Sequence, residues 1–439
     1  MSSSGATTIE SKLRRKLTIT RVVLALLVLS AATGLLAYSF GGPTFEPRVG
    51  HLAPVPAALA DRVTVLGLPN ARFWAWYDTQ GPVMVTEWEG SLQRERASLW
   101  LAADAPLPPA YFMAVSGGGG DGAFGAGLIC GWSESGALPK FKLVTGVSTG
   151  SMIAPFVFLG GPYIDTLRTI YTTISDRDVR TMRALNGLYG VVFSDAMADT
   201  TPLYKLISRY VDEQMLADLA AAYGQGRMLL VATANLDQQR PVLWNIGAIA
   251  ASGHPDALEL VRKVILASAA IPAAFPPVMI DVEADGQQYQ EMHVDAGVVA
   301  QTFLYPSYLG YQVDFRSGAF KRERHAYIIR NSRLDPNWAS VNREFLTITQ
   351  RSIATMIHYL GYNDLLRVYE TTKRDGIDFN LAYIGTDFNK PKVDTFDPDY
   401  MKALFDYAFE KGRHGYAWQK TPPISAAELT SETTTGGSQ

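Results

Sequence analysis

The chain has 439 residues, of which 47% are hydrophobic, 18% charged and 11% aromatic, a composition that excludes a mostly disordered protein. A formal net charge of −3 does not support binding to nucleic acids, which usually requires a basic excess. A lone cysteine excludes an intramolecular disulfide, a CxxC redox pair and a four-cysteine zinc site, and the six histidines form no HExxH motif, so we expect no metal and no cofactor.

A basic segment followed by an apolar run marks the amino terminus. Five cations within residues 1–21 precede residues 22–40, whose length is close to the roughly 20 residues that a membrane-spanning helix needs. We expect an uncleaved transmembrane anchor, a cytoplasmic basic end and a body on the periplasmic or extracellular side. The alternative is a signal sequence cleaved near Ala32 or Ala37, which would give a secreted protein.

Residues 41–109 form a Trp/Pro-rich extension. Within it, Arg72–Tyr77 and Val83–Trp88 alternate in a way that predicts short strands. We expect its tryptophans to pack on the core, because large aromatic side chains are usually buried; contact with the lipid interface is the alternative. The four tryptophans are Trp74, Trp76, Trp88 and Trp100.

Strand and helix patterns alternate from residue 110 onward. The expected strands are Tyr111–Ser116, Phe141–Val147, Arg227–Leu236, Gln290–Val294, His325–Arg330 and Asn380–Ile384. The expected helices are Asp121–Ser135, Ser151–Leu159, Pro162–Ser175, Thr201–Val211, Asp256–Ala269, Pro398–Lys411 and a long one over Asn337–Arg374, broken near Gly361.

This alternation predicts an α/β fold with three layers, α/β/α, around a mainly parallel central sheet. The predicted catalytic domain spans residues 110–335, and a helical carboxy-terminal part over residues 336–422 is expected to pack on it. The Ser/Thr/Gly-rich tail over residues 423–439 is expected to be disordered.

A G-x-S-x-G element occupies residues 146–150, between an expected strand and an expected helix. In that context the motif places its serine on a sharp turn with the hydroxyl exposed, and the flanking Gly146 and Gly150 relieve crowding. Ser148 is therefore a candidate nucleophile. The alternative interpretation is an ordinary glycine-rich turn between a strand and a helix.

A glycine run, Gly117-Gly118-Gly119-Gly120-Asp121-Gly122, follows the first of these strands. Consecutive glycines let backbone N–H groups approach a ligand, which in acyl transfer makes an oxyanion hole. Dinucleotide binding is disfavoured because the second strand does not end in an acidic residue, and a P-loop is excluded because no Gly-Lys-Ser/Thr follows. Asp121 is expected to cap or charge the start of the next helix.

A carboxylate ends a third segment, His293-Val294-Asp295-Ala296-Gly297. An acid at the end of a strand is well placed to accept a proton from a serine on a neighbouring strand. Asp295 is therefore a candidate general base. The alternative is a loop aspartate that accepts hydrogen bonds from nearby backbone N–H groups.

These motifs and their order, together with Leu266–Pro277 (LASAAIPAAFPP), make Tyr111–Leu334 resemble the patatin-like phospholipases of the bacterial type, membrane-anchored or secreted. The resemblance implies hydrolysis of lipid acyl esters by Ser148 and Asp295, a dyad without histidine that acts through an acyl-enzyme. It also implies an oxyanion hole at Gly118, Gly119 and Gly120. The glycines that would support these motifs are Gly117, Gly122, Gly146, Gly150 and Gly297. The implied partners are a lipid or acyl-ester substrate and a membrane.

The sequence departs from that family at two positions. Asp121 stands where the family usually has Arg or Lys, and Ala296 stands where it usually has Gly. Two other functions stay open. One is a Ser-His-Asp esterase of the α/β-hydrolase type using a late histidine, and the other is a non-catalytic, membrane-anchored binding protein on the same fold. The late histidines are His325, His358 and His414.

Overall fold

The structure is a computed structural model in which two compact units, Met1–Ala53 and Pro54–Gln439, are distinguished. It describes residues 52–75, 81–102, 104–182, 198–272, 274–313, 315, 321–336, 338–394 and 396–423. The anchor or signal expected at residues 22–40, and residues 424–439 of the expected tail, lie outside these ranges. Within them, no helix combines the length and the apolar character needed to cross a bilayer.

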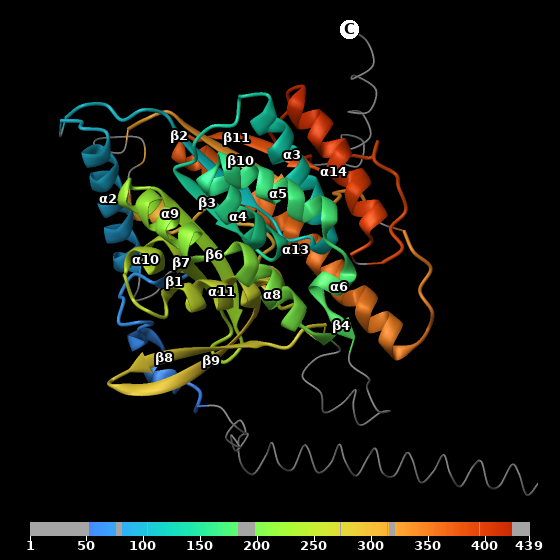
Figure 1. The fold of residues 1–439 in the computed structure, drawn as a ribbon, viewed down its shortest axis with the longest axis horizontal. Coiled ribbons are helices and arrows are strands. Elements are labelled where there is room, and N and C mark those ends of the chain that lie inside the picture. Colours follow the sequence, from blue (N-terminus) through green and yellow to red (C-terminus); the bar gives the residue numbers. More distant parts are fainter. Residues whose placement is uncertain are drawn as a thin grey trace, which may run out of the picture. The chain divides into compact units, whose positions relative to one another are not determined.

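A nine-stranded sheet forms the centre of the second unit, counted over the described residues (Figure 1). Its main path runs β1-β7-β6-β3-β2-β10-β11, and the hairpin β8–β9 joins it through β6. The five strands from β6 to β11 on this path are mutually parallel, whereas β1, β7, β8 and β9 join by antiparallel pairing. The prediction of a mainly parallel sheet is confirmed. The strands are β1 (Arg72–Trp74), β2 (Ala110–Val115), β3 (Leu143–Gly146), β6 (Met228–Asn235), β7 (Arg240–Asn245), β8 (Val278–Ala284), β9 (Gln287–Asp295), β10 (Arg324–Arg330) and β11 (Asp378–Tyr383).

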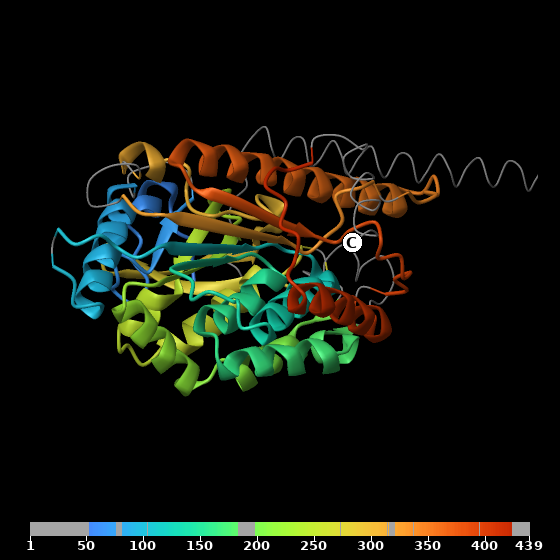
Figure 2. The ribbon, with the colours of Figure 1, turned by 90° about the horizontal axis from the view of Figure 1, so that it is seen from above.

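Helices cover both faces of the sheet. Figure 2 shows the long helix α13, in orange, along one face, and the helices that follow β2, β3 and β7 on the other, with α14 beside them in red. The helices are α2 (Gly81–Ser98), α3 (Gly122–Glu134), α4 (Thr149–Leu159), α5 (Pro162–Thr173), α6 (Asp176–Val179), α8 (Thr201–Tyr210), α9 (Glu213–Gly224), α10 (Ile246–Ala251), α11 (Ala257–Ser268), α12 (Leu309–Gln312), α13 (Phe345–Asp375) and α14 (Pro398–Arg413). The short elements are η1 (Ala57–Arg62), η2 (Gly119–Asp121), η3 (Ala296–Val298) and the pair β4 (Thr181–Met182) and β5 (Ala198–Asp199).

Two hydrophobic cores lie on the two faces of the sheet. Successive side chains of a strand point to opposite faces, and β2 follows this rule. Its Met113 and Val115 join the core beneath α3, α4 and α14, whereas Phe112 and Ala114 join the core shared with α2 and α13. The run YFMAV is apolar throughout because both of its faces are buried, as is typical of parallel strands.

The segment Val83–Trp88 is helical, so the prediction of a strand there was wrong. Residues 81–98 form α2, and its buried side chains Met84, Trp88 and Leu92 recur every four residues, as one face of a helix requires. Six residues that alternate are too few to separate the two periods. Arg72–Trp74 is a strand as predicted, while residues 76–77 lie outside the described ranges.

The tryptophans of the extension divide between core and surface. Trp74 and Trp88 are buried, which confirms the expected packing for these two, whereas Trp100 is 94% exposed. Trp76 lies outside the described residues. The described part of the extension from Pro54 onward therefore belongs to the second unit, with β1 paired to β7 and α2 packed on the core that includes Phe112.

The long helix does not break at Gly361, so that prediction was also wrong. Helix α13 runs without interruption from Phe345 to Asp375 and begins later than the expected Asn337. A Cβ at Gly361 would overlap the guanidinium of the buried Arg330. The glycine is explained by this close approach of helix and arginine, and it does not end the helix.

Helices α3 and α14 pack with their backbones close together. A Cβ on Gly127 or Gly131 of α3 would overlap the carbonyl oxygen of Phe405 or Phe409 in α14. The reciprocal overlap would occur between Gly412 and α3. This contact positions α14, whose first turn reaches the site described below.

Replacing Gly131 with Ala should therefore lower the melting temperature. Gly224→Ala is the matched control, because a Cβ there meets nothing within 4 Å. Helix propensity favours Ala over Gly at both positions, and by no less at Gly131, which lies inside its helix, than at Gly224, which ends its helix. A lower stability of the Gly131 variant therefore reports the overlap, which we expect to cost about 1–3 kcal/mol. Thermal unfolding followed by circular dichroism measures both variants, and equal melting temperatures would contradict this account of the helix contact.

Candidate active site

Strands β3 and β9 approach each other end to end along one edge of β6. Strand β3 ends with Gly146 opposite Val231, and β9, running the other way, ends with Asp295 opposite Thr233. Strand β7 occupies the other edge of β6 over these positions. Val231 and Thr233 are two residues apart on β6, which corresponds to about 7 Å along the strand. The turn after β3 and the last residue of β9 are therefore neighbours, although they are far apart in the sequence.

Ser148 lies on the turn between β3 and α4. It has φ +53° and ψ −126°, a conformation that residues other than glycine rarely adopt. Its N–H donates a hydrogen bond of 3.0 Å to the Oγ of Ser268, which belongs to the LASAAIPAAFPP segment. A Cβ on Gly146 would lie 2.5 Å from the carbonyl oxygen of Gly150, so the sharp turn predicted from the motif needs glycine there.

Asp295 is buried beside this serine. Its carboxylate accepts hydrogen bonds from the Ser148 hydroxyl and, at 2.7 Å, from the N–H of Gly297. Burial raises the pKa of Asp295 to about 6, and these two hydrogen bonds act against that rise by favouring the charged form. The structure thus joins the two residues that the sequence singled out as nucleophile and base.

The glycine loop, residues 117–122, lies against the serine. A Cβ on Gly117 would lie 3.1 Å from the Cβ of Ser148, and a Cβ on Gly118 would overlap the carbonyl oxygen of Asn331. Gly119, with φ +58°, begins the short turn η2, which also contains the buried Gly120. Among the described residues, no backbone acceptor is paired with the N–H groups of Gly118 and Gly119, which fits the oxyanion-donor role that the resemblance implies for them.

Asn331, which sequence reasoning missed, holds this loop in place. The residue follows β10 and is fully buried. Its Nδ2 donates to the carbonyl of Ser116 at 2.8 Å, its backbone N–H donates to the Ser116 hydroxyl at 2.8 Å, and its Oδ1 accepts from the N–H of Gly125 at 2.9 Å. The available signal was a polar residue directly after an apolar strand, at the sheet edge where the glycine loop also lies.

Gln301 connects the glycine loop to the turn that carries the carboxylate. Its carbonyl accepts from the N–H of Gly117 at 3.1 Å, and its Nε2 donates to the carbonyl of Gly297 at 2.8 Å. Its own N–H donates to Asp364 of α13 at 2.6 Å. A Cβ on Gly297 would lie 2.6 Å from that Nε2, so a larger residue would displace the connection.

Asp121 lies at the start of α3, where the sequence predicted that it caps or charges the helix, and only the capping part of that prediction is wrong. No side-chain capping bond is formed there, because the carboxylate instead binds Lys392 at 2.8 Å and the hydroxyl of Tyr400. The acid therefore ties the glycine loop to the segment that leads into α14. The second departure from the family, Ala296, is fully buried at the start of η3 and packs in the core shared with α13.

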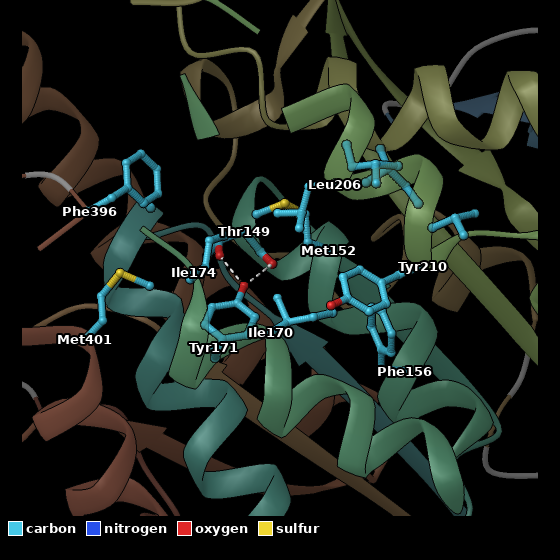
Figure 3. Close-up of a pocket in the computed structure, with 14 residues that line it drawn as sticks. Thr149, Met152, Phe156, Ile170, Tyr171, Ile174, Leu206, Tyr210, Phe396 and Met401 are labelled. Atoms are coloured by element: carbon cyan, nitrogen blue, oxygen red, sulfur yellow. Dashed lines mark hydrogen bonds between the residues drawn. The ribbon is translucent and has the colours of Figure 1, made fainter. Parts of the chain in front are cut away.

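An apolar pocket opens next to the glycine loop and the serine turn (Figure 3). Its walls come from α4, α5, α8, α11 and the start of α14, and Thr149, the neighbour of Ser148, lies on its floor with its hydroxyl 2.7 Å from that of Tyr171. The lining residues are Gly119, Thr149, Met152, Phe156, Ile170, Tyr171, Ile174, Leu206, Ile207, Tyr210, Val211, Ile265, Phe396 and Met401.

The histidines have other partners. His293 is buried, and its ring contacts Thr233 at 2.9 Å and Glu291 at 3.2 Å. His325 begins β10, at the opposite edge of the sheet, where it pairs with Asp378. His358 lies on α13, and His414 contacts Glu410 at the end of α14. Within the described residues, no histidine forms a hydrogen bond or ion pair with Ser148 or Asp295, which disfavours the Ser-His-Asp interpretation.

If the glycine loop supplies oxyanion donors, as the resemblance implies, Asn331→Ala should lower kcat for ester hydrolysis by about 10²-fold, because a loosened loop misplaces those donors. The buried Ser116 carbonyl and Gly125 N–H would also lose their partner, at about 1–3 kcal/mol each in stability. Asn245→Ala is the control, since Asn245 is equally buried but caps α10, far from the serine in the chain. A comparable kcat for both variants, measured below their unfolding temperatures, would refute the role assigned to Asn331.

Comparison with known proteins identifies a match to one family. Residues 113–306, which contain the glycine loop, Ser148 and Asp295, match the family model described as patatin-like phospholipase. No curated protein matches the chain at a significant level. Among solved structures, VipD from Legionella pneumophila is 10% identical over 71% of this chain and 67% of its own, with a TM-score of 0.29. Human GIVD cytosolic phospholipase A2 is 10% identical over 65% of this chain and 51% of its own, so the chain spans about half of that enzyme, again with a TM-score of 0.29. Both TM-scores are too low to add to the family match.

Proposed function

Since residues 113–306 match the patatin-like phospholipase family, we propose that this chain is a lipid acyl hydrolase in which Ser148 and Asp295 form the catalytic dyad. The observation that carries the proposal is the hydrogen bond from the Ser148 hydroxyl to a buried carboxylate at the edge of an apolar pocket. A nucleophile, a base within hydrogen-bond reach and a fitting cavity are the parts that acyl transfer needs.

In the proposed mechanism, Ser148 attacks the ester carbonyl while Asp295 takes its proton. The N–H groups of Gly118 and Gly119 then stabilise the oxyanion, since both lack a backbone acceptor in the described structure. Asp295 returns the proton to the leaving alcohol, which departs and leaves an acyl-enzyme. Water, deprotonated by the same carboxylate, then releases the fatty acid and restores the serine.

The pocket supports an acyl chain as the part of the substrate that it holds. Most of its lining is aliphatic or aromatic, and its few polar groups include the hydroxyls of Thr149 and Tyr171, which are bonded to each other. A hydrocarbon chain that leaves water for such walls gains about 0.8 kcal/mol per buried CH₂. Because Gly119 and Thr149 line the same pocket, an acyl chain there has its carbonyl end close to Ser148 and the glycine loop.

We also propose that residues 22–40 anchor the chain, with the catalytic unit on the non-cytoplasmic side. The support is the clustered cations that precede an apolar run of membrane-spanning length. A lipid hydrolase held at a bilayer has its substrate within reach.

Ser148→Ala and Asp295→Asn should each abolish labelling by a fluorophosphonate probe and lower ester hydrolysis by about 10⁴-fold or more. Asp295→Asn keeps the shape and the acceptor oxygen for Gly297, so it tests proton transfer without a cavity. Ser252→Ala, which changes a half-exposed serine at the end of α10, is the control and should label like the parent chain. Persistent labelling of the Ser148→Ala variant would show that another residue is the nucleophile.

The rate should rise with pH through about 6 and level off above it, because only ionised Asp295 accepts the serine proton. The free energy of unfolding should change in the opposite direction and fall as pH rises. A carboxyl whose pKa is higher in the folded state binds more protons there, so folding loses stability as pH rises from about 4 to 6. Asp295→Asn should remove this loss and stabilise the chain at pH 7 by up to about 3 kcal/mol.

The profile of kcat/KM against pH measures the effect on the rate. Denaturant titrations at pH 4, 6 and 7 measure the effect on stability. A rate that is independent of pH between 5 and 7, with a parent chain whose stability does not fall over the same range, would rule out Asp295 as the base.

A further inference from the structure

Helix α13 extends well beyond the sheet on which it packs. Its 31 residues span about 46 Å, whereas the six residues of the neighbouring β11 span about 20 Å. The helix leads into β11 through Gly376, so its carboxy-terminal end lies at the start of that strand. Its amino-terminal half, residues 345–361, therefore projects past the carboxyl edge of the parallel strands, as Figure 2 shows for the orange helix. We call these residues the overhang.

The exposure of side chains along α13 changes at the same place. From Gly361 onward the helix has a buried face, which includes Asp364, Leu365 and Val368. Before Gly361, residues 352–356 are exposed without interruption, so no described part of the chain covers that stretch.

The overhang exposes apolar side chains. Its exposed large side chains are Ile348, Ile353, Met356 and Tyr359, and Met356 is 64% exposed. Trp338 and Val341, in the segment before the overhang, are exposed as well, Trp338 at 85%. Over residues 338–361, only Arg343, Glu344 and Arg351 carry a charge. An apolar patch of this kind on a folded unit marks a surface that another body covers.

The edge that the overhang extends is the edge of the candidate active site. The glycine loop follows β2, Ser148 follows β3 and Asn331 follows β10, all at the carboxyl ends of parallel strands. Asn331 both holds the glycine loop and begins the segment that carries Trp338 into α13. The apolar surface and the site therefore lie on the same side of the molecule.

We propose that the overhang, with Trp338 and Val341, is the surface that lies on the lipid bilayer from which the enzyme takes its substrate. This inference rests on the proposed function. Long aliphatic side chains together with Trp and Tyr suit the boundary between headgroups and acyl chains. The helix is not apolar enough to span a bilayer, so it lies in the interface. A lipid surface is favoured over a second copy because the glycine loop and Ser148, where a lipid substrate must arrive in every catalytic cycle, lie at the same edge of the sheet as the overhang.

Depth-dependent quenching tests the contact directly. The full chain with Met356→Cys, labelled with the environment-sensitive dye NBD, is reconstituted into phosphatidylcholine/phosphatidylglycerol vesicles that contain a doxyl-labelled lipid. Cys130 is fully buried, and burial raises the pKa of its thiol to about 12, so the introduced cysteine takes the label. Trp100→Cys is the reference, because Trp100 is 94% exposed and precedes β2, at the opposite edge.

The label at 356 should shift to the blue and be quenched several-fold more than the label at 100. Equal quenching at the two positions would overturn the proposal. So would a blue shift at 356 that needs no lipid and grows with protein concentration, because it would identify a second copy as the occupant.

Kinetics provide the second readout. The variant Ile353→Ser/Met356→Ser/Tyr359→Ser changes only exposed side chains, so it should fold like the parent chain. It should hydrolyse vesicle phospholipid at least about tenfold more slowly and a soluble short-chain ester at the parent rate. An unchanged rate on vesicles would overturn the inference. If the parent chain hydrolyses neither substrate, the proposed function fails, whereas the quenching result still decides the lipid contact.

Discussion

The pairing of β6 with two successive partners is the constraint on which the candidate site depends. One edge of β6 pairs first with β3 and then, in the opposite direction, with β9. A serine that follows one strand therefore meets a carboxylate that ends the other, and backbone ladders set the position of both. Because side chains alternate along a strand, a slip of one residue in the β9 register would turn Asp295 to the other face and remove the dyad.

The same edge gives Asp295, the proposed base, a pKa that suits proton transfer near neutral pH. Burial raises the pKa of Asp295 to about 6, and the bonds from Ser148 and Gly297 keep it from rising further. The surrounding backbone is close-packed, which is why Asn331 and Gln301 matter although neither reacts. They join the glycine loop to β10 and to the Asp295 turn, so the proposed oxyanion donors and the dyad move as one body.

Two apolar surfaces at this edge fit one kind of substrate. The pocket beside Thr149 is lined from one face of the sheet, and the overhang of α13 extends from the other. An apolar pocket of this kind suits a single hydrocarbon chain, whereas an exposed apolar helix suits a broad surface. A lipid in a bilayer presents both a single hydrocarbon chain and a broad apolar surface. The pocket and the exposed face of α13 therefore fit the kind of substrate that the family match implies.

The sequence by itself determined most of the parallel strands, the glycine loop, the G-x-S-x-G turn and the Asp295 strand end, because each rests on a local pattern of a few residues. It did not indicate β7, β8 or α9. It did not determine the helical structure of Val83–Trp88, where six residues fit a strand and a helix equally. It also did not explain Gly361, which is required by the close approach of the buried Arg330 on β10. It also misplaced the role of Asp121, whose partner Lys392 lies 271 residues further on. Only the tertiary structure decided these contacts and the exposure of α13, since they depend on which remote segments the sheet brings together.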